Sequence, residues 1–430
     1  MRKSLSREEL LALHDEQRER VSPAERLRSL NRRLEKQARF AYRNSPAVRE
    51  IFDNAGIPPS SIRTVADLEE LPVTTREDLE ELQRSRPPFG GFLAVPLGSL
   101  DRVYVAPGPV YAVWGPERIQ AQVRSLLRLG YPRPGDVALV SSAFHMGPAG
   151  LGVTDALDMM GCTVVPAGTG QTELQVKLLH DLQATALLAL PSLAITILHK
   201  AEELGYDVRR DFNLKLVTGG GERQIQTLKR VFEEEYGLVV WDAYGTADLG
   251  PVAYCCGQAE GYHYDDEACV VEIADPDTGK HVGTGEVGQV VVTLFSRVYP
   301  LVRFGTGDLA SFTDEPCPCG RSAPRITGIK GMVAQHVRVK GMFVHQGELA
   351  EAMTAFPQIL KYQMLLTLDE HKDRVALKVE VPAGVDREAL APAVSRRCQD
   401  VLKLHMDEIE FLPEGALSGS SERFADRRWG

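Results

Sequence analysis

The sequence lacks an apolar run long enough to cross a membrane. Its longest apolar stretch, ATALLALPSLAITIL from Ala184 to Leu198, is interrupted by Pro191, whereas a membrane helix needs about 20 consecutive apolar residues. The stretch is therefore predicted to be a buried element. The N-terminus also lacks the apolar core of a secretory signal. We therefore expect a cytoplasmic protein that has no membrane partner.

An excess of basic residues is also missing. The chain has 49 Lys and Arg against 59 Asp and Glu, which gives a net charge of -10 at pH 7, and its pI is near 5.6. No stretch combines clustered Lys and Arg with interleaved aromatic side chains. This composition argues against a general nucleic-acid-binding protein.

Cysteine is scarce, and its number is odd. There are seven cysteines in a chain without a visible export signal. Disulfides are typical of secreted proteins, so reduced thiols or metal ligands are the preferred interpretation.

The length of 430 residues predicts two or three folding units. Residues 1–100 carry helical periodicity, with an apolar stripe marked by Leu27, Leu30, Leu34 and Phe40. The rest of the chain divides by pattern into residues 101–250 (α/β), 251–330 (richer in strands) and 331–430 (a small α+β unit).

The middle region has the pattern of a mainly parallel sheet covered by helices. Five short apolar runs are predicted strands, most of them separated by helical patterns: DVALVSSA, GCTVVPAG, ALLALPS, LKLVTGG and LVVWDAYG. GERQIQTLKRVFEEEYG is a predicted helix with Ile225, Leu228, Phe232 and Tyr236 on one face and Gly237 at its end. The fold class is therefore α/β.

Three loops in this region are candidate ligand sites, because such sheets bind ligands at the carboxyl ends of their strands. They are TGGGE (residues 218–222), DAYGTADLG (residues 242–250) and RFGTGDLA (residues 303–310). Singly each signal is weak. A glycine cluster after a strand is more often a tight turn, and an Asp in such a loop often caps one.

The order and spacing of these loops resemble the adenylate-forming superfamily, and within it the phenylacetate-CoA ligase family. The similarity begins at RNSPAVREIFDNAGIPPSSIRTVADLEELPVTTREDL and continues through GGGER, AYGTADLG, GEVGQVVVTLF, PLVRFGTGDLA and CPCGR to VRVKGMFV. It implies a large N-terminal adenylate-forming domain over residues 1–330 and a small mobile C-terminal lid domain over residues 331–430. It also implies ATP or AMP, Mg²⁺ and coenzyme A as ligands.

The resemblance assigns roles to individual residues. Tyr244 would stack on the adenine, and Thr246 would contact the α-phosphate. Asp248 stands where the family usually has a Glu that holds Mg²⁺, and Asp308 would accept hydrogen bonds from both ribose hydroxyls. The remaining predicted nucleotide-binding residues are Gly220, Gly221, Glu222, Asp242 and Gly245.

A second constellation can be argued from residue types alone. Cys256 and His263 lie close in sequence, and Cys317 and Cys319 form a C-P-C pair. Three thiolates and an imidazole make the closed ligand set of a structural Zn²⁺ site. The alternative is scattered core thiols, and Cys255 is the substitute ligand.

A third stretch, SSAFHMGPAGLG, follows a predicted strand. The resemblance places the acyl pocket here, which makes Phe144, His145 and Gly150 candidate substrate contacts. A loop histidine with no role in binding is an equally good interpretation of His145.

Four departures from the family pattern concern the triphosphate and the transfer step. The phosphate loop reads APGPVYAVWG (residues 106–115), where prolines remove amide donors and Ser, Thr and Lys are missing. No lysine follows Lys403, and Glu422 or Arg423 lies nearest to the expected catalytic lysine. Gly305 replaces a basic residue, and Met332 and Ala334 replace the usual hinge residues.

Two hypotheses remain. The first is an AMP-forming acyl- or aryl-CoA ligase that activates an aromatic acid, either with Arg423 and other loop donors in place of the lysine or with a slow first step. The second is a relative that binds AMP, an acyl-adenylate or an acyl-CoA without turning over ATP. Relatives of this type are often homodimers, so a homodimer is also an expectation.

Overall fold

The computed structural model of the chain describes residues 16–428, apart from 107–108, 129–131, 219–224, 277, 334–335, 341, 370–371 and 418–422. The chain divides into two compact units, Met1–Gly331 and Met332–Gly430. Within the described residues, no helix is both long and apolar enough to span a membrane.

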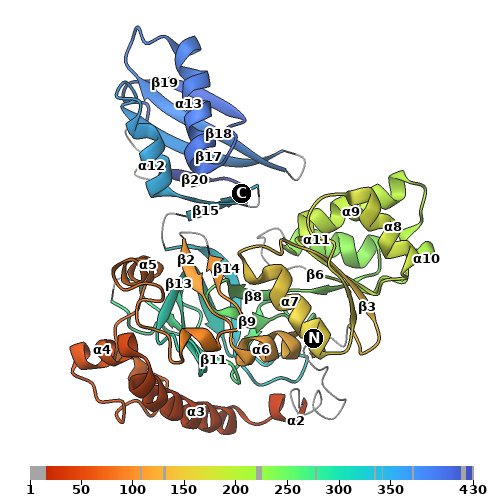
Figure 1. The fold of residues 1–430 in the computed structure, drawn as a ribbon, viewed down its shortest axis with the longest axis vertical. Helices are drawn as coiled ribbons and strands as arrows, with labels where there is room; N and C mark the ends of the chain where they lie inside the picture. Colours follow the sequence, from red (N-terminus) through yellow and green to blue (C-terminus); the bar gives the residue numbers. More distant parts are fainter. Residues whose placement is uncertain are drawn as a thin grey trace. The chain divides into compact units, whose positions relative to one another are not determined.

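The first unit contains a five-stranded parallel sheet with the order β4-β3-β5-β6-β7 (Figure 1). All five runs predicted as strands are confirmed. Their bounds are β3 (Val137–Ser141), β4 (Thr163–Val165), β5 (Ala186–Ala189), β6 (Leu216–Thr218) and β7 (Val239–Trp241).

The two faces of this sheet belong to different hydrophobic cores, because successive strand residues point to opposite sides. Leu139, Leu187 and Val217 enter one core with α8 (Thr172–Asp181), α9 (Pro191–Glu203) and α11 (Ile225–Arg230). Their neighbours Val140, Leu188 and Leu216 enter the other with α6 (Pro116–Leu127) and α7 (Pro148–Met159). The result is a three-layer α/β/α arrangement.

The apolar stretch around Pro191 is buried, as predicted. It forms β5 and then α9, in which Pro191 takes the first helical position, where its missing N–H costs no hydrogen bond. The predicted helix after residue 222 differs in detail. α11 ends at Arg230 and continues as the π-helical turn η3 (Val231–Glu235), which still buries Phe232. The short helix α10 (Val208–Asp211) precedes β6.

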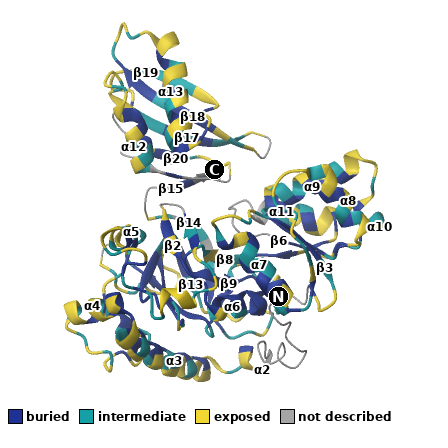
Figure 2. Ribbon diagram, in the orientation of Figure 1, coloured by how far each residue is buried: buried dark blue, intermediate teal, exposed yellow. Residues whose placement is uncertain are grey.

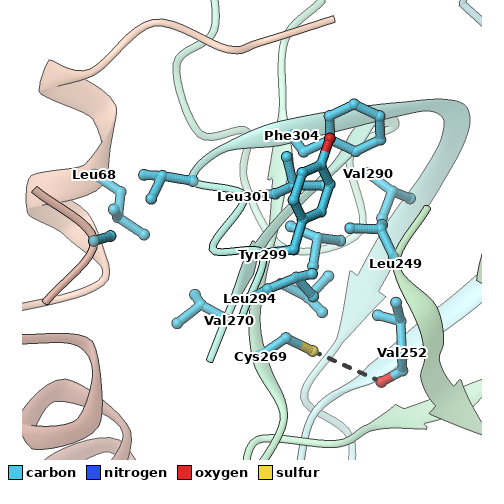
Figure 3. Packing of buried hydrophobic residues seen from close by; sticks show 14 of the residues in the cluster. Leu68, Leu249, Val252, Cys269, Val270, Val290, Leu294, Tyr299, Leu301 and Phe304 are labelled. Atoms are coloured by element: carbon cyan, nitrogen blue, oxygen red, sulfur yellow. Dashed lines mark hydrogen bonds between the residues drawn. The ribbon is translucent and has the colours of Figure 1, made fainter. Parts of the chain in front are cut away.

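A seven-stranded sheet of order β11-β12-β13-β14-β10-β9-β8 forms the β-rich part. Its core includes Tyr299, Leu294 and Phe304, which pack with Leu68 from the helical lead-in (Figure 3). The strands are β8 (Ala243–Thr246), β9 (Gly250–Tyr254), β10 (Tyr262–Tyr264), β11 (Cys269–Ala274), β12 (Gly288–Leu294), β13 (Phe304–Thr313) and β14 (Arg325–Met332). A separate hairpin is formed by β1 (Tyr104–Ala106) and β2 (Val110–Ala112).

The helical lead-in packs on this sheet through α3 (Pro23–Asn44), whose Ser22 side chain accepts a hydrogen bond from the Glu25 N–H. Leu30 and Leu34 are buried, but the expected position of Leu27 in the stripe is wrong, because Leu27 is 50% exposed. Arg26 takes the buried position one turn before Leu30. The other elements are α2 (Glu16–Glu19), α4 (Pro46–Ala55), η1 (Ala66–Glu70), α5 (Arg76–Ser85) and η2 (Leu97–Ser99).

The second unit contains a four-stranded sheet of order β19-β18-β17-β20 (Figure 2). β17 (Lys361–Asp369) and β18 (Lys372–Val381) form the predicted antiparallel pair, and α13 (Arg387–Leu402) is the predicted amphipathic helix. The remaining elements are β15 (His336–Val339), β16 (Met342–His345), α12 (Gln346–Thr354), β19 (Glu408–Pro413) and β20 (Phe424–Asp426).

The helix α8 offers a matched test of the core. Leu179 is 1% exposed and Leu174 on the same helix is 47% exposed. We expect Leu179→Ala to lower the free energy of unfolding by about 2–5 kcal/mol, because it leaves a cavity. Leu174→Ala should change it by about 0.5 kcal/mol or less. Equal losses in urea denaturation of the two variants would contradict this core assignment.

Candidate functional site

The stretch from Asp242 to Gly250 is a tight β-hairpin. β8 pairs antiparallel with β9, with Thr246 opposite Gly250 and a register shift between Tyr244 and Gly245. A Cβ atom on Gly245 would lie 2.2 Å from the carbonyl oxygen of Gly250. Glycine is therefore required here by the close approach of the two strands.

Tyr244 and Asp308, which the resemblance assigned to the adenine and to the ribose, are in contact in the structure. The Tyr244 hydroxyl donates to Asp308 Oδ2 at 2.9 Å and also lies 3.0 Å from Thr306 Oγ1. Burial, together with the charge of Asp308, raises the pKa of Tyr244 well above its ordinary value, so the hydroxyl stays protonated and can donate. The loops around residues 244 and 308 therefore converge on one region.

This contact requires a strongly curled sheet. Three strands separate β8 from β13 in the sheet order, so the two strands would lie about 19 Å apart if the sheet were flat. Two side chains cannot bridge that distance. The curl of the seven-stranded sheet brings Tyr244 of β8 to the Asp308 carboxylate.

Asp242 is buried beside this hairpin. Its Oδ2 accepts a hydrogen bond from the Tyr262 hydroxyl at 2.7 Å. Burial raises the pKa of Asp242 to about 6, and the Tyr262 hydrogen bond only partly opposes that shift.

Thr246 and Asp248 lie at the turn of the hairpin. Thr246 Oγ1 accepts from the Leu249 N–H at 3.2 Å. Asp248 is 1% exposed, and its Oδ2 lies 3.0 Å from Nη1 of Arg76. Its Oδ1 has no hydrogen-bond partner among the described residues. A buried carboxylate oxygen of this kind is a ligand that suits a hard cation, so Asp248 fits the predicted Mg²⁺ role.

Sequence reasoning missed Arg76, which comes from the helical lead-in. Thr75 and Asp78 form a capping box that starts α5, and Arg76 is the first residue of this helix. The TTRED sequence shows the capping box, but only the fold brings Arg76 to Asp248, 172 positions away.

Trp114 was also missed. Its indole N–H donates to the carbonyl of Ala247 at 2.9 Å, and its ring packs edge-on against Tyr104 at 5.8 Å between centroids. A Cβ atom on Gly152 of α7 would lie 2.3 Å from the Trp114 ring. This ring therefore fills the space between α7 and the β8–β9 hairpin.

The candidate acyl residues lie at the start of α7. Phe144 is partly buried against the same core as Trp114, whereas His145 is exposed. A Cβ atom on Gly150 would lie 2.6 Å from the Ala143 carbonyl oxygen, so the loop folds closely over the helix there. Of the three, only Phe144 packs with its side chain on this hydrophobic core.

The predicted phosphate loop coincides with the β1–β2 hairpin. Its tip at residues 107–108 lies outside the described part of the chain, as do Gly220, Gly221, Glu222, Ala334 and Glu422. The Gln83 side chain of α5 accepts from the Tyr111 N–H at 2.7 Å and donates to the Tyr111 carbonyl at 2.8 Å. α5 thus fixes this hairpin at one end and carries Arg76 at the other.

In the second unit, Arg423 comes directly before β20. Its guanidinium carbon lies 5.0 Å from the centroid of the Tyr362 ring, and its Nη1 donates to the Tyr362 hydroxyl. Its carbonyl accepts from the Met364 N–H at 2.9 Å.

The four predicted metal ligands come together in the first unit. The ligand atoms of Cys256, His263, Cys317 and Cys319 all lie within 4.8 Å of one another. His263 Nδ1 lies 2.9 Å from the Ala323 carbonyl, which can only accept, so Nδ1 carries the proton and Nε2 faces Cys319 Sγ at 3.4 Å. Burial lowers the pKa of His263 to about 4, which keeps the imidazole neutral and able to bind a metal. The site fits a tetrahedral cation.

Cys255 does not join this cluster. Its thiol is buried and lies 3.9 Å from the Val240 carbonyl, while the neighbouring Cys256 Sγ lies 3.5 Å from Cys317 Sγ.

A family model described as "AMP-binding enzyme" matches residues 111–294. The phenylacetate-coenzyme A ligase of Thermus thermophilus is 30% identical over 85% of this chain and 84% of its own length. That of Aromatoleum evansii is 30% identical over 92% and 93%. A crystal structure of 2-hydroxyisobutyryl-CoA ligase with 2-HIB-AMP and CoA has a TM-score of 0.84 and 25% identity, and covers 96% of this chain and 92% of that one.

Asp242 gives a pH test of the hairpin. Its pKa in the folded protein is raised, so folding binds a proton between about pH 4 and 6 and the stability due to this group falls as pH rises through that window. Asp242→Asn removes the buried charge and keeps an acceptor for Tyr262. We compare the free energy of unfolding of the variant with that of the unchanged protein. We expect this difference to move in favour of the variant by on the order of 2 kcal/mol between about pH 4 and about pH 7.

The measurement is urea denaturation at both pH values, with Asp314→Asn as the control at an exposed position. A stability difference for Asp242→Asn that does not change with pH would contradict the buried, proton-binding carboxyl.

Proposed function

The chain belongs to the phenylacetate-CoA ligase family and is an AMP-forming carboxylate-CoA ligase, and we propose that its acid is aromatic, of the phenylacetate type. In this reaction a carboxylate oxygen attacks the α-phosphorus of ATP and pyrophosphate leaves. The thiol of coenzyme A then attacks the acyl carbon, and AMP leaves.

The aromatic wall beside the nucleotide hairpin is the observation that carries the choice of acid. Trp114 is anchored to Ala247 by its indole N–H, Tyr104 packs against it, and Phe144 lies against the same core. Aromatic rings favour edge-to-face and offset contacts with other rings. An aryl group attached to a carboxylate at Thr246 would meet this wall.

The nucleotide is proposed to lie along β8 and the middle of β13. Asp308 would accept from the ribose hydroxyls while the Tyr244 hydroxyl holds one of its carboxylate oxygens in place. Pre-orientation of a carboxylate by a buried donor reduces the cost of ordering it when the ligand binds. The ring of Tyr244 would line the adenine site.

Charge at the phosphates is proposed to come from Arg76 as well as from Mg²⁺. The phosphate loop has no lysine, and Arg76 supplies a cation at Asp248 from another part of the chain. The cation bound at Asp248 would neutralise phosphate charge. Arg423 remains the proposed replacement for the C-terminal lysine, which would require it to leave Tyr362.

The acid is tested with a panel containing phenylacetate, benzoate, 2-hydroxyisobutyrate and acetate. We expect ATP-dependent release of pyrophosphate to be fastest with phenylacetate, and about tenfold or more slower with acetate, because an unfilled apolar pocket loses binding energy. The measurement is coupled pyrophosphate detection with and without coenzyme A.

Two outcomes would contradict the proposal. Preference for 2-hydroxyisobutyrate over every aromatic acid would overturn the aromatic substrate. Tight AMP binding without pyrophosphate release from any acid would favour the second hypothesis, a relative that does not adenylate. Trp114→Leu is the matched variant, and it should weaken the preference for aryl acids more than it slows turnover.

We also propose that the Cys256, His263, Cys317 and Cys319 cluster holds a structural Zn²⁺. Three thiolates and one imidazole fill a tetrahedral shell and leave no position for substrate, so the ion would stabilise the fold and would not catalyse. The loop after Cys319 also reaches the N-terminal helices: the Ser322 N–H donates to the Glu19 carbonyl at 2.9 Å, and Arg321 pairs with the Glu19 carboxylate. The metal would thereby anchor α2.

Metal analysis tests the zinc proposal. We expect about one equivalent of zinc in the purified protein and its loss in the double variant Cys317→Ser, Cys319→Ser, with faster hydrogen exchange around Glu19 because its anchor is loosened. Cys255→Ser, which changes a thiol outside the cluster, should keep the zinc. Less than about half an equivalent in the unchanged protein would refute the site.

A further inference from the structure

The segment that leads into α5 is bound to the start of β13. Thr74 forms a parallel bridge with Phe304. The Thr74 N–H donates to the Arg303 carbonyl at 2.9 Å, and the Gly305 N–H donates to the Thr74 carbonyl at 3.0 Å. Arg76 follows two residues after this bridge, so the bridge fixes the first residue of α5 close to the start of β13.

The buried Arg303 side chain also binds the segment that leads into α5. It is 1% exposed, and its guanidinium donates to the carbonyl of Leu71, to the carbonyl of Gly279 at 2.6 Å and to Glu272 Oε1 at 3.0 Å. A buried guanidinium is tolerated only where its donors are matched by acceptors and its charge by a carboxylate. Arg303 therefore ties Leu71 to the β-rich sheet.

The N-terminal end of the segment is held by a second set of contacts. His281 Nε2 lies 2.7 Å from Glu272 Oε1, and its Nδ1 lies 3.2 Å from Glu69 Oε1. Lys280 Nζ donates to the Glu69 carbonyl at 3.1 Å. Residues 69–74 are thus fixed at one end by the β11–β12 connection and at the other by the start of β13.

Gly305 makes room for this arrangement. A Cβ atom at this position would lie 2.4 Å from Gln289 Nε2 and 3.0 Å from Val73 Cγ1. Any side chain would push Val73 away from β13 or displace Gln289. Gly305 stands where the family pattern has a basic residue. Its missing side chain leaves room for Val73, and therefore for the segment that brings a different cation, Arg76, to Asp248.

We propose that Arg303 is a positioning residue for the adenylation step, because it fixes residues 71–75 so that Arg76 meets Asp248. The inference rests on the proposed function for the part played by Arg76 at the phosphates. On this proposal β13 contributes in two ways. Its first residues, together with Arg303 just before them, position Arg76, and Asp308 further along the strand contacts Tyr244.

The structural arm of the test is hydrogen exchange, which needs no activity. Arg303→Lys retains the charge but cannot reproduce a three-acceptor fork. We expect exchange of the Thr74 and Gly305 amides to become about tenfold faster or more in this variant. Unchanged exchange at both amides would overturn the proposal.

The kinetic arm is a double-mutant cycle on pyrophosphate release at varied ATP. We expect Arg303→Lys and Arg76→Ala each to lower kcat/KM for ATP by about tenfold, and the double variant to be no slower than Arg76→Ala alone, because Arg303 acts through Arg76. Effects that multiply would overturn the proposal, since they would show that Arg303 acts by another route.

A matched control separates positioning from general loss of structure. Arg26 is also a buried arginine. It donates to the Glu19 carbonyl and pairs with Asp266, and neither partner belongs to the segment that leads into α5. The effect of Arg26→Lys should multiply with that of Arg76→Ala. If Arg303→Lys does not fold, Gly305→Ala serves as the second variant, with the same expected pattern at Thr74 and in the cycle.

Failure of the proposed function and failure of the Arg303 role give different results. No pyrophosphate release with any acid would contradict the proposed function, and the exchange result would then decide the positioning claim by itself. Normal release in Arg76→Ala would remove Arg76 from adenylation and would overturn the proposal.

Discussion

The hydrogen bond from the Tyr244 hydroxyl to Asp308 Oδ2 is the contact on which the site depends. It joins two strands that a flat sheet would keep far apart, so it can form only because the seven-stranded sheet curls. Gly245, which has no space for a side chain, permits the close pairing of β8 with β9. The turn of this hairpin also contacts the helical lead-in, where Asp248 pairs with Arg76.

The lead-in contacts the candidate site at two points. α5 carries Arg76 to Asp248 at its first residue and holds the β1–β2 hairpin through Gln83 near its last turn. Two of the departures from the family pattern, the phosphate loop and Gly305, lie in segments that contact α5 or the residues that lead into it.

Much of the fold followed from sequence pattern. Strands of the parallel sheet are short apolar runs because both of their faces are buried, and such runs are legible without tertiary information. The Cys and His cluster was also legible, because metal ligands are few and chemically distinctive. Leu27 was mispredicted because a stripe marks a helix face only to within one residue at its end.

Arg76, Trp114 and Arg303 could not be assigned from sequence pattern for a different reason. Their partners are Asp248, the Ala247 carbonyl and the Leu71 carbonyl, each more than a hundred positions away along the chain. A local sequence pattern does not show which distant residue a side chain will contact. In addition, two of the three acceptors are backbone carbonyl oxygens, which every residue has.

A crystal structure of the protein with bound AMP tests the central claim most directly. We predict the ribose hydroxyls on Asp308, the base along Tyr244 and the phosphate between Thr246 and Arg76. A nucleotide bound elsewhere, or a phosphate that leaves Arg76 paired only with Asp248, would contradict the account.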